Sequence, residues 1–149
     1  MSFELQSLSQ PEFQALSREN TVFFICLGPM EDHGGHLPIG ADIYEATTFA
    51  KIVAHEIEKE LPGWQVGFLP PLSMGVESNT SLFSITIRAH VLRDYLVDTC
   101  QSLVTQGFKK FVCFSGHSGP KQLTTIEEAG KLLRKKNKSW LKRTDLPSL

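Results

Sequence analysis

Four side chains that can bind a metal ion lie in one short segment, Leu27–Asp42. They are Glu31, His33, His36 and Asp42. Carboxylate and neutral imidazole together suit Zn, Mn, Fe or Co better than Ca or Mg. Glu31 and His33 are one residue apart, so an extended backbone would point both side chains the same way. The segment therefore predicts a site for a divalent transition metal.

The elements on either side of this segment would place it at the edge of a sheet. Residues 22–27 form an unbroken apolar run bounded by Gly28-Pro29, which is typical of a strand buried on both faces. From 42 to 61, apolar residues recur at helical spacing, and the expected buried stripe is Phe49, Ile52, Val53 and Ile57. In open α/β sheets, ligands bind outside the carboxyl ends of the strands, where such loops lie.

A second loop rich in histidine and glycine follows the apolar run at 111–114. It reads Ser115-Gly116-His117-Ser118-Gly119-Pro120. Two strand-end loops of a doubly wound sheet can meet at a switch point, so we expect His117 to join Glu31, His33 and Asp42. Asp42 would lie in the first turn of its helix, where the dipole favours an anion and where a carboxylate could bridge two metals. His55 and His90 are expected to be structural.

The remaining patterns predict an α/β protein. We expect helices over 9–19, 90–106 and 120–136, strands over 65–69 and 111–114, and a half-exposed strand over 82–87. This order predicts a three-layer α/β/α sandwich with a mostly parallel sheet. A chain of 149 residues is expected to form one domain. No apolar run approaches a membrane span and no signal peptide is evident, so we expect a cytoplasmic protein with no membrane partner.

Charge and cysteine content add two expectations. Residues 131–149 hold seven of the 15 Lys and Arg and one acid, Asp145. This cluster is a possible nucleic-acid contact, but we favour a solvated helix end, where cations also suit the dipole, and expect no nucleic acid to bind. The three cysteines have no paired spacing, so we expect reduced core residues at Cys26, Cys100 and Cys113.

The spacing Glu-x-His-Gly-x-His-Leu-Pro-x-Gly-x-Asp over residues 31–42 resembles the signature of the creatininase (creatinine amidohydrolase) family. Residues 114–119 are similar to its second signature, a strand ending in Gly-His-Gly-Gly-Asn. The resemblance covers about residues 5–135. It implies a three-layer α/β/α fold and a two-metal centre, usually of Zn or Mn. Such a centre would hydrolyse a C–N bond of a small cyclic or linear amide with a metal-activated water.

The resemblance also implies roles for individual residues. Glu31 and His117 would bind one metal and His33 the other, Asp42 would bridge the two, and His36 would orient a ligand or the loop. It assigns no proton-transfer residue that this chain retains. Gly119 stands where many members carry a further acidic ligand, so a single metal site is a second reading.

The chain is also shorter than most members of that family. We therefore expect residues 1–149 to be a single creatininase-like domain that lacks the usual C-terminal part and ends in a basic tail at 137–149. Three functions remain open: an active amidohydrolase, a catalytically impaired binding or oligomeric module, and a binder of nucleic acid or acidic partners through the tail. A sheet edge left bare by the missing part would be sticky, so we expect a homo-oligomer.

Overall fold

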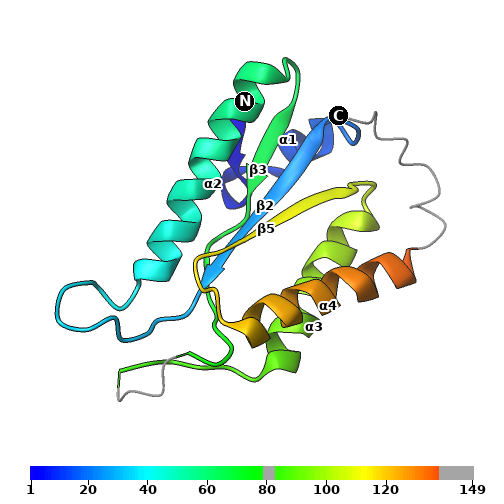
Figure 1. Cartoon of the computed structure of the whole chain (residues 1–149). Helices are drawn as coiled ribbons and strands as arrows, with labels where there is room; N and C mark the ends of the chain where they lie inside the picture. The colour runs from blue at the N-terminus through cyan, green and yellow to red at the C-terminus, as the bar shows by residue number, and fades with distance from the viewer. Residues whose placement is uncertain (79–82, 138–149) are drawn as a thin grey trace.

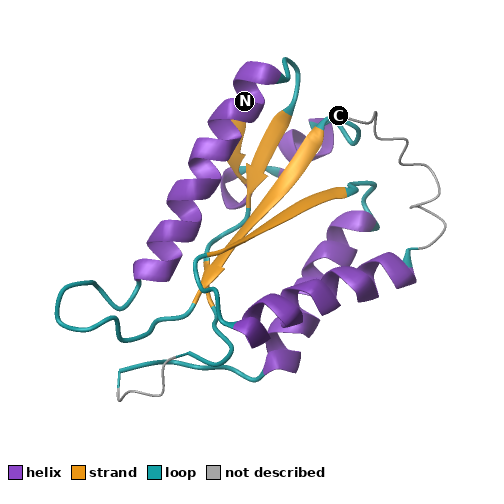
Figure 2. Cartoon of the chain, in the orientation of Figure 1, coloured by secondary structure: helices purple, strands orange, loops and turns teal. Residues whose placement is uncertain are grey.

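The computed structural model describes residues 1–78 and 83–137, and it has a parallel sheet between two layers of helices (Figures 1 and 2). Helix α2 (Ala41–Glu60) covers one face of the sheet. Helices α3 (Ala89–Val104) and α4 (Pro120–Lys136) pack side by side on the other. The predicted three-layer α/β/α sandwich is confirmed. The segment 138–149, which holds nearly all of the predicted basic tail, lies outside the described residues.

Strand β2 (Thr21–Gly28) is the centre of the sheet. It pairs in parallel with β3 (Gln65–Phe68) on one side and with β5 (Lys110–Ser115) on the other. Leu27 pairs both with Ser115 of β5 and with the short β4 (Leu72–Ser73), so β4 continues the line of β3. Strand β1 (Ser2–Glu4) lies outside β3, also in parallel.

The alternation of side chains along β2 divides the core in two. Phe23, Ile25 and Leu27 point toward α3 and α4, where they pack with residues such as Leu92 and Leu96. Val22, Phe24 and Cys26 point toward α2. Burial of each large apolar side chain contributes about 1.5–3 kcal/mol, so this strand supplies a large part of the stability.

The predicted apolar stripe of α2 is wrong in part. Phe49 and Ile52 are 60% and 57% exposed, and the residues against the sheet are instead Asp42, Ala46, Ala50 and Ala54. Both sets recur at the three-residue or four-residue spacing of a helix face. The face with the small side chains packs against the sheet because these residues let the helix axis come close to the strands, whereas larger residues would hold it away.

Several boundaries also differ from the sequence-based expectations. Helix α1 covers only Gln10–Ala15 of the expected 9–19, and it begins with a capping box formed by Ser9 and Glu12. A 3₁₀ turn at Leu5–Ser7 and the short strands β1 and β4 were not expected. Residues 83–87 form no strand and contribute only an antiparallel bridge from Ile85 to Met30. Strands of two or three residues are too short to show an alternating pattern.

The cysteine expectation is confirmed. Cys26, Cys100 and Cys113 are free thiols, the first two buried and the third half-buried. Burial raises the pKa of Cys26 and Cys100 to about 11 and that of Cys113 to about 12, so the thiols stay protonated and unreactive at neutral pH. In the described part of the chain, the helices are too short or too polar to span a bilayer.

Candidate metal centre

The register of the sheet brings the two histidine-containing loops together. Because β2 and β5 are neighbours and run in parallel, the chain leaves both at the same edge, and the Gly116 amide donates to the Leu27 carbonyl oxygen (3.1 Å). Helix α2 begins directly over this edge. A Cβ at Gly116 would lie 1.9 Å from the main-chain oxygen of Asp42, and one at Gly28 would lie 2.7 Å from its Cβ. Glycine at both positions allows Asp42 to sit between the strand ends.

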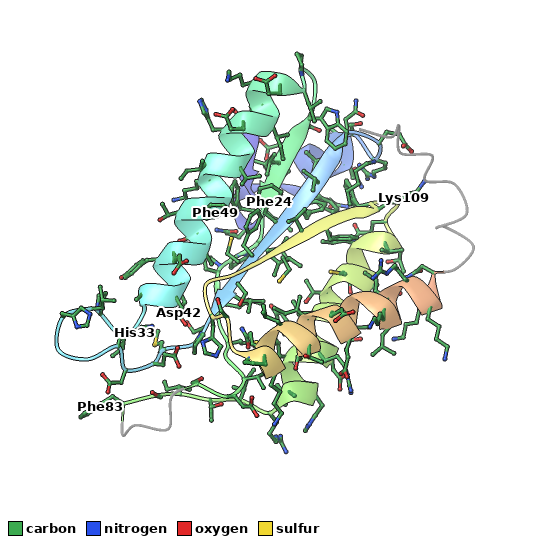
Figure 3. The ribbon with its side chains drawn as sticks, viewed as in Figure 1. Phe24, His33, Asp42, Phe49, Phe83 and Lys109 are labelled. Atoms are coloured by element: carbon green, nitrogen blue, oxygen red, sulfur yellow. The ribbon has the colours of Figure 1, made fainter. Side chains whose placement is uncertain are left out.

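Four of the predicted residues meet at this edge. Glu31, Asp42 and His117 each offer a ligand atom, and these atoms lie within 4.8 Å of one another. The His117 Nδ1 is 3.0 Å from a Glu31 carboxylate oxygen and 3.5 Å from Asp42 Oδ2. The His33 Nε2 is 3.0 Å from Asp42 Oδ1 (Figure 3). Asp42 therefore lies between the two histidines, as a bridging carboxylate would.

The tautomer of His33 is set by the main chain. Its Nδ1 lies 3.1 Å from the main-chain carbonyl oxygen of Glu31, which can only accept, so this nitrogen donates. In the neutral ring the Nε2 is then an acceptor, and it faces Asp42. In most metal-binding histidines, the ring nitrogen that does not bind the metal donates a hydrogen bond, as Nδ1 of His33 does here.

The site is buried and electrostatically unfavourable on its own. Glu31 is 6% exposed and Asp42 is 4% exposed. Burial, and next the negative charge of Glu31, raise the pKa of Asp42. Among the described residues, Asp42 Oδ2 and His117 Nε2 are buried without a hydrogen-bond partner. Two adjacent buried carboxylates with imidazole nitrogens and unused lone pairs are a donor set that fits a divalent Zn or Mn ion.

The other candidate residues lie away from this cluster. His36 is exposed, and a Cβ on Gly34 would lie 3.4 Å from its Nδ1. Glu77 is exposed and pairs with Lys121 at 3.1 Å, and Glu127 pairs with Lys131 at 2.6 Å. Glu45, Glu128, His55 and His90 are exposed too. The carboxylates of Glu45, Glu77, Glu127 and Glu128 are therefore exposed to solvent and stand apart from the cluster.

The structure explains why residue 119 is a glycine. A Cβ at this position would lie 2.4 Å from the Nε2 of His117. An acidic side chain could not be added here unless the imidazole moved. The position at which the resemblance would place a further acidic ligand therefore makes room for His117 in this chain.

Sequence reasoning missed Gln122, which fixes the loop that carries His117. This fully buried residue of α4 accepts from the Val76 amide (2.8 Å) and donates to the Met74 carbonyl (3.3 Å) and to Ser115 Oγ (3.4 Å). Ser115 Oγ in turn donates to the His117 carbonyl oxygen (2.8 Å). A polar residue on the inward face of a helix, with Thr125 and Ala129, was the available signal.

We expect Gln122→Leu to lower the free energy of unfolding by about 2 kcal/mol, because it leaves the Val76 amide and the Met74 carbonyl buried without a partner. Metal affinity should fall as well, since the His117 loop loses its support. Urea unfolding would measure the first effect and calorimetric metal titration the second. Gln106→Leu is the matched control, because this side chain is exposed and donates to the main-chain oxygen of Ser102, four residues earlier. Equal losses in both variants would contradict this role.

Comparison with known proteins gives a consistent picture. The sequence model of a family described as creatininase (creatinine amidohydrolase) matches residues 6–147. A curated relative, the mycofactocin precursor peptide peptidase of Mycobacterium ulcerans (strain Agy99), is 33% identical over 99 residues, which make up 64% of this chain and 39% of the relative.

Solved structures show the same fold. A creatininase described with Mn superposes with a TM-score of 0.78 at 21% identity, over 93% of this chain and 54% of that one. A mutant creatininase of Zn-Zn type gives 0.75 at 20% identity, over 93% and 54%. A putative creatinine amidohydrolase from Bacteroides fragilis gives 0.69 at 23% identity, over 87% and 51%. The chain thus spans about half the length of these structures, and less of the curated relative.

Proposed function

This chain belongs to the creatininase family, and on that premise we propose that it is a metal-dependent hydrolase that cleaves a C–N bond of a small cyclic or linear amide. The observation that carries the proposal is the convergence of Glu31, Asp42 and His117 at the buried edge of the sheet. Both Mn and Zn occur in the descriptions of creatininases that share the fold, so either ion is a candidate.

Each residue would have a distinct part. Glu31 and His117 would hold one ion, Asp42 would bridge toward a second, and His33 would bind that second ion through Nε2. A bound ion would supply a Lewis acid and a water of lowered pKa. Asp42 and Glu31 are shielded from solvent, which keeps competing water away from their oxygens. Within the described residues, His33 Nε2 lies 3.0 Å from Asp42 and 3.8 Å from Glu31, so one ion held by Glu31, His33, Asp42 and His117 together is the simplest occupancy.

A peptide amide is a second candidate substrate. The curated relative at 33% identity carries the name of a peptide peptidase, and a peptide bond has the same carbonyl and C–N linkage as a small amide. Residues 34–39, which lie between His33 and Asp42 in the sequence, are exposed. An exposed loop beside the proposed ligands is compatible with a substrate that extends beyond the reacting bond.

Metal titration of the dialysed chain is the first test. We expect binding of at least one Zn or Mn per chain, and hydrolysis of a cyclic amide or a short peptide only in the loaded protein. Absence of binding with both ions would overturn the proposal. Binding without turnover of either substrate would support the impaired, non-catalytic alternative.

Two neighbouring histidines should differ in importance. His33→Ala is expected to weaken metal binding more than tenfold, because Nε2 faces Asp42 at 3.0 Å. His36→Ala should weaken it less than tenfold, since His36 would act only by shaping the exposed turn. The same calorimetric titration measures both variants. A larger effect at His36 would mean that the loop closes over the ion when metal is present.

A further inference from the structure

Residues 83–87, here called the strap, lie against the loop that follows β2. An antiparallel bridge joins Ile85 of the strap to Met30 of the loop, and the Ile85 amide donates to the Met30 carbonyl oxygen (2.8 Å). Figure 3 shows Phe83 of the strap and His33 of the loop at the same end of the molecule. The strap thus reaches the segment that carries two of the proposed metal ligands.

The hydroxyl group of Ser84 holds the main chain between those two ligands. Its Oγ accepts a hydrogen bond from the Asp32 amide (3.1 Å), and the serine is half-buried. Asp32 is the one residue between Glu31 and His33 in the sequence. Because the backbone sets the direction of successive side chains, a bond that fixes the Asp32 amide also fixes where the Glu31 carboxylate and the His33 ring point.

Hydrogen bonds within the loop carry this restraint to both ligands. The Glu31 amide donates to the Ile39 carbonyl oxygen (2.9 Å), and the Gly34 amide donates to Asp32 Oδ1 (2.9 Å). The Nδ1 of His33 donates to the Glu31 carbonyl oxygen (3.1 Å). The Asp32 amide is therefore the point at which the strap enters a network that already joins the two ligand residues.

The strap is also tied to the part of the chain that supports His117. The Ile87 amide donates to the Gly75 carbonyl oxygen (2.8 Å), and the next amide along the chain, that of Val76, donates to Gln122 (2.8 Å). The same glutamine supports the loop of His117 through a serine hydroxyl. A displacement of the strap would therefore change the position of one ligand loop relative to the other.

We propose that Ser84 is a positioning residue of the metal centre, which holds Glu31 and His33 in the directions that a divalent ion requires. The proposal rests on the proposed function, because it needs the ion that these ligands would bind. Before an ion arrives, the buried carboxylates of Glu31 and Asp42 repel each other and favour an open arrangement. A loop fixed by Ser84 resists that opening, so less ordering is required when metal binds.

Calorimetric titration of the full 149-residue chain with Zn²⁺ tests the proposal. Ser84→Ala should raise the dissociation constant about tenfold, the loss typical when a group that orients a ligand is removed. Ser84→Thr keeps the hydroxyl group and should restore most of the affinity. The matched control is Thr86→Val, which removes a hydroxyl group from the same strap that donates to the Gly75 carbonyl oxygen and not to the ligand loop.

Urea unfolding of the metal-free variants separates positioning from stability. Ser84→Ala and Thr86→Val should unfold at similar urea concentrations, although only the first should bind zinc more weakly. A loss of affinity that Ser84→Thr does not restore, or that Thr86→Val reproduces, would overturn the proposal.

Hydrogen exchange measured by NMR gives a readout that does not need the metal. In the metal-free chain, the Asp32 amide should exchange about tenfold faster in Ser84→Ala than in Ser84→Thr, because its acceptor is gone. Equal exchange rates would overturn the proposal. Unchanged zinc affinity in Ser84→Ala would overturn it and leave the proposed function standing, whereas a wild-type chain that binds neither Zn nor Mn would overturn both.

Discussion

Asp42→Asn is expected to abolish metal binding and, at the same time, to stabilise the metal-free protein. The carboxylate is 4% exposed and lies beside the buried Glu31, and burial is the largest reason that its pKa is raised. An amide of the same shape removes one of two like charges and retains the packing. We expect the free energy of unfolding to rise by about 1 kcal/mol. Titration calorimetry and urea unfolding without metal would measure the two effects.

The pH dependence of this gain has a definite sign. Because the pKa of Asp42 is raised in the folded state, the folded protein binds the proton more tightly than the unfolded chain does. The stability from this group is present below its ordinary pKa of 3.8 and is lost as pH rises through the folded pKa. The advantage of Asn should therefore be full at neutral pH and should shrink as pH falls toward 3.8. An advantage that does not change with pH would contradict the charge explanation.

Gly116→Ala is expected to be among the most damaging single changes in the chain. Its new Cβ would lie 1.9 Å from the main-chain oxygen of Asp42, and a backbone atom cannot yield as a flexible side chain can. Either β5 or the first turn of α2 must move. We expect a loss of about 3 kcal/mol in the free energy of unfolding, together with loss of metal binding. Thermal unfolding followed by circular dichroism would detect the first effect.

Gly35 provides the control for the same substitution. A Cβ there meets nothing within 4 Å, although the residue lies in the same sequence motif as Glu31 and Asp42. Gly35→Ala should change stability by less than about 0.5 kcal/mol. Equal damage at both glycines would show that the motif needs loop flexibility and not the close approach of α2 to β5.

The fold and the site were predictable to different degrees. Buried strands such as 22–27 and the long helices carry strong composition and periodicity, so their positions in sequence indicated a parallel α/β sheet. That order also predicted that the loops with Glu31 and His117 would meet, because parallel neighbours end at one edge. The sequence could not reveal which side of a helix packs against the sheet. For this reason Phe49 and Ile52 were expected in the core, although both are exposed.

Supporting contacts were harder to foresee than ligands. Gln122 looks like an ordinary helix residue, and its role depends on Val76, Met74 and Ser115, which come from two distant segments. Gly116 and Gly28 resemble common turn glycines, although each is needed for the approach of α2. These requirements depend on how closely helices and strands approach one another in the folded protein. A single sequence does not show these distances.

The proposed ligand set draws on three parts of the chain: the loop after β2, the first turn of α2 and, much later in the sequence, the loop after β5. On the ribosome, synthesis proceeds from the N-terminus, and His117 is the last of these ligands to be made. A nascent chain that ends before it would hold Glu31 and Asp42 without the partner that closes the site. Metal binding should thus begin only once His117 has left the exit tunnel. A nascent chain with bound metal would therefore be one in which β2 and β5 have already paired.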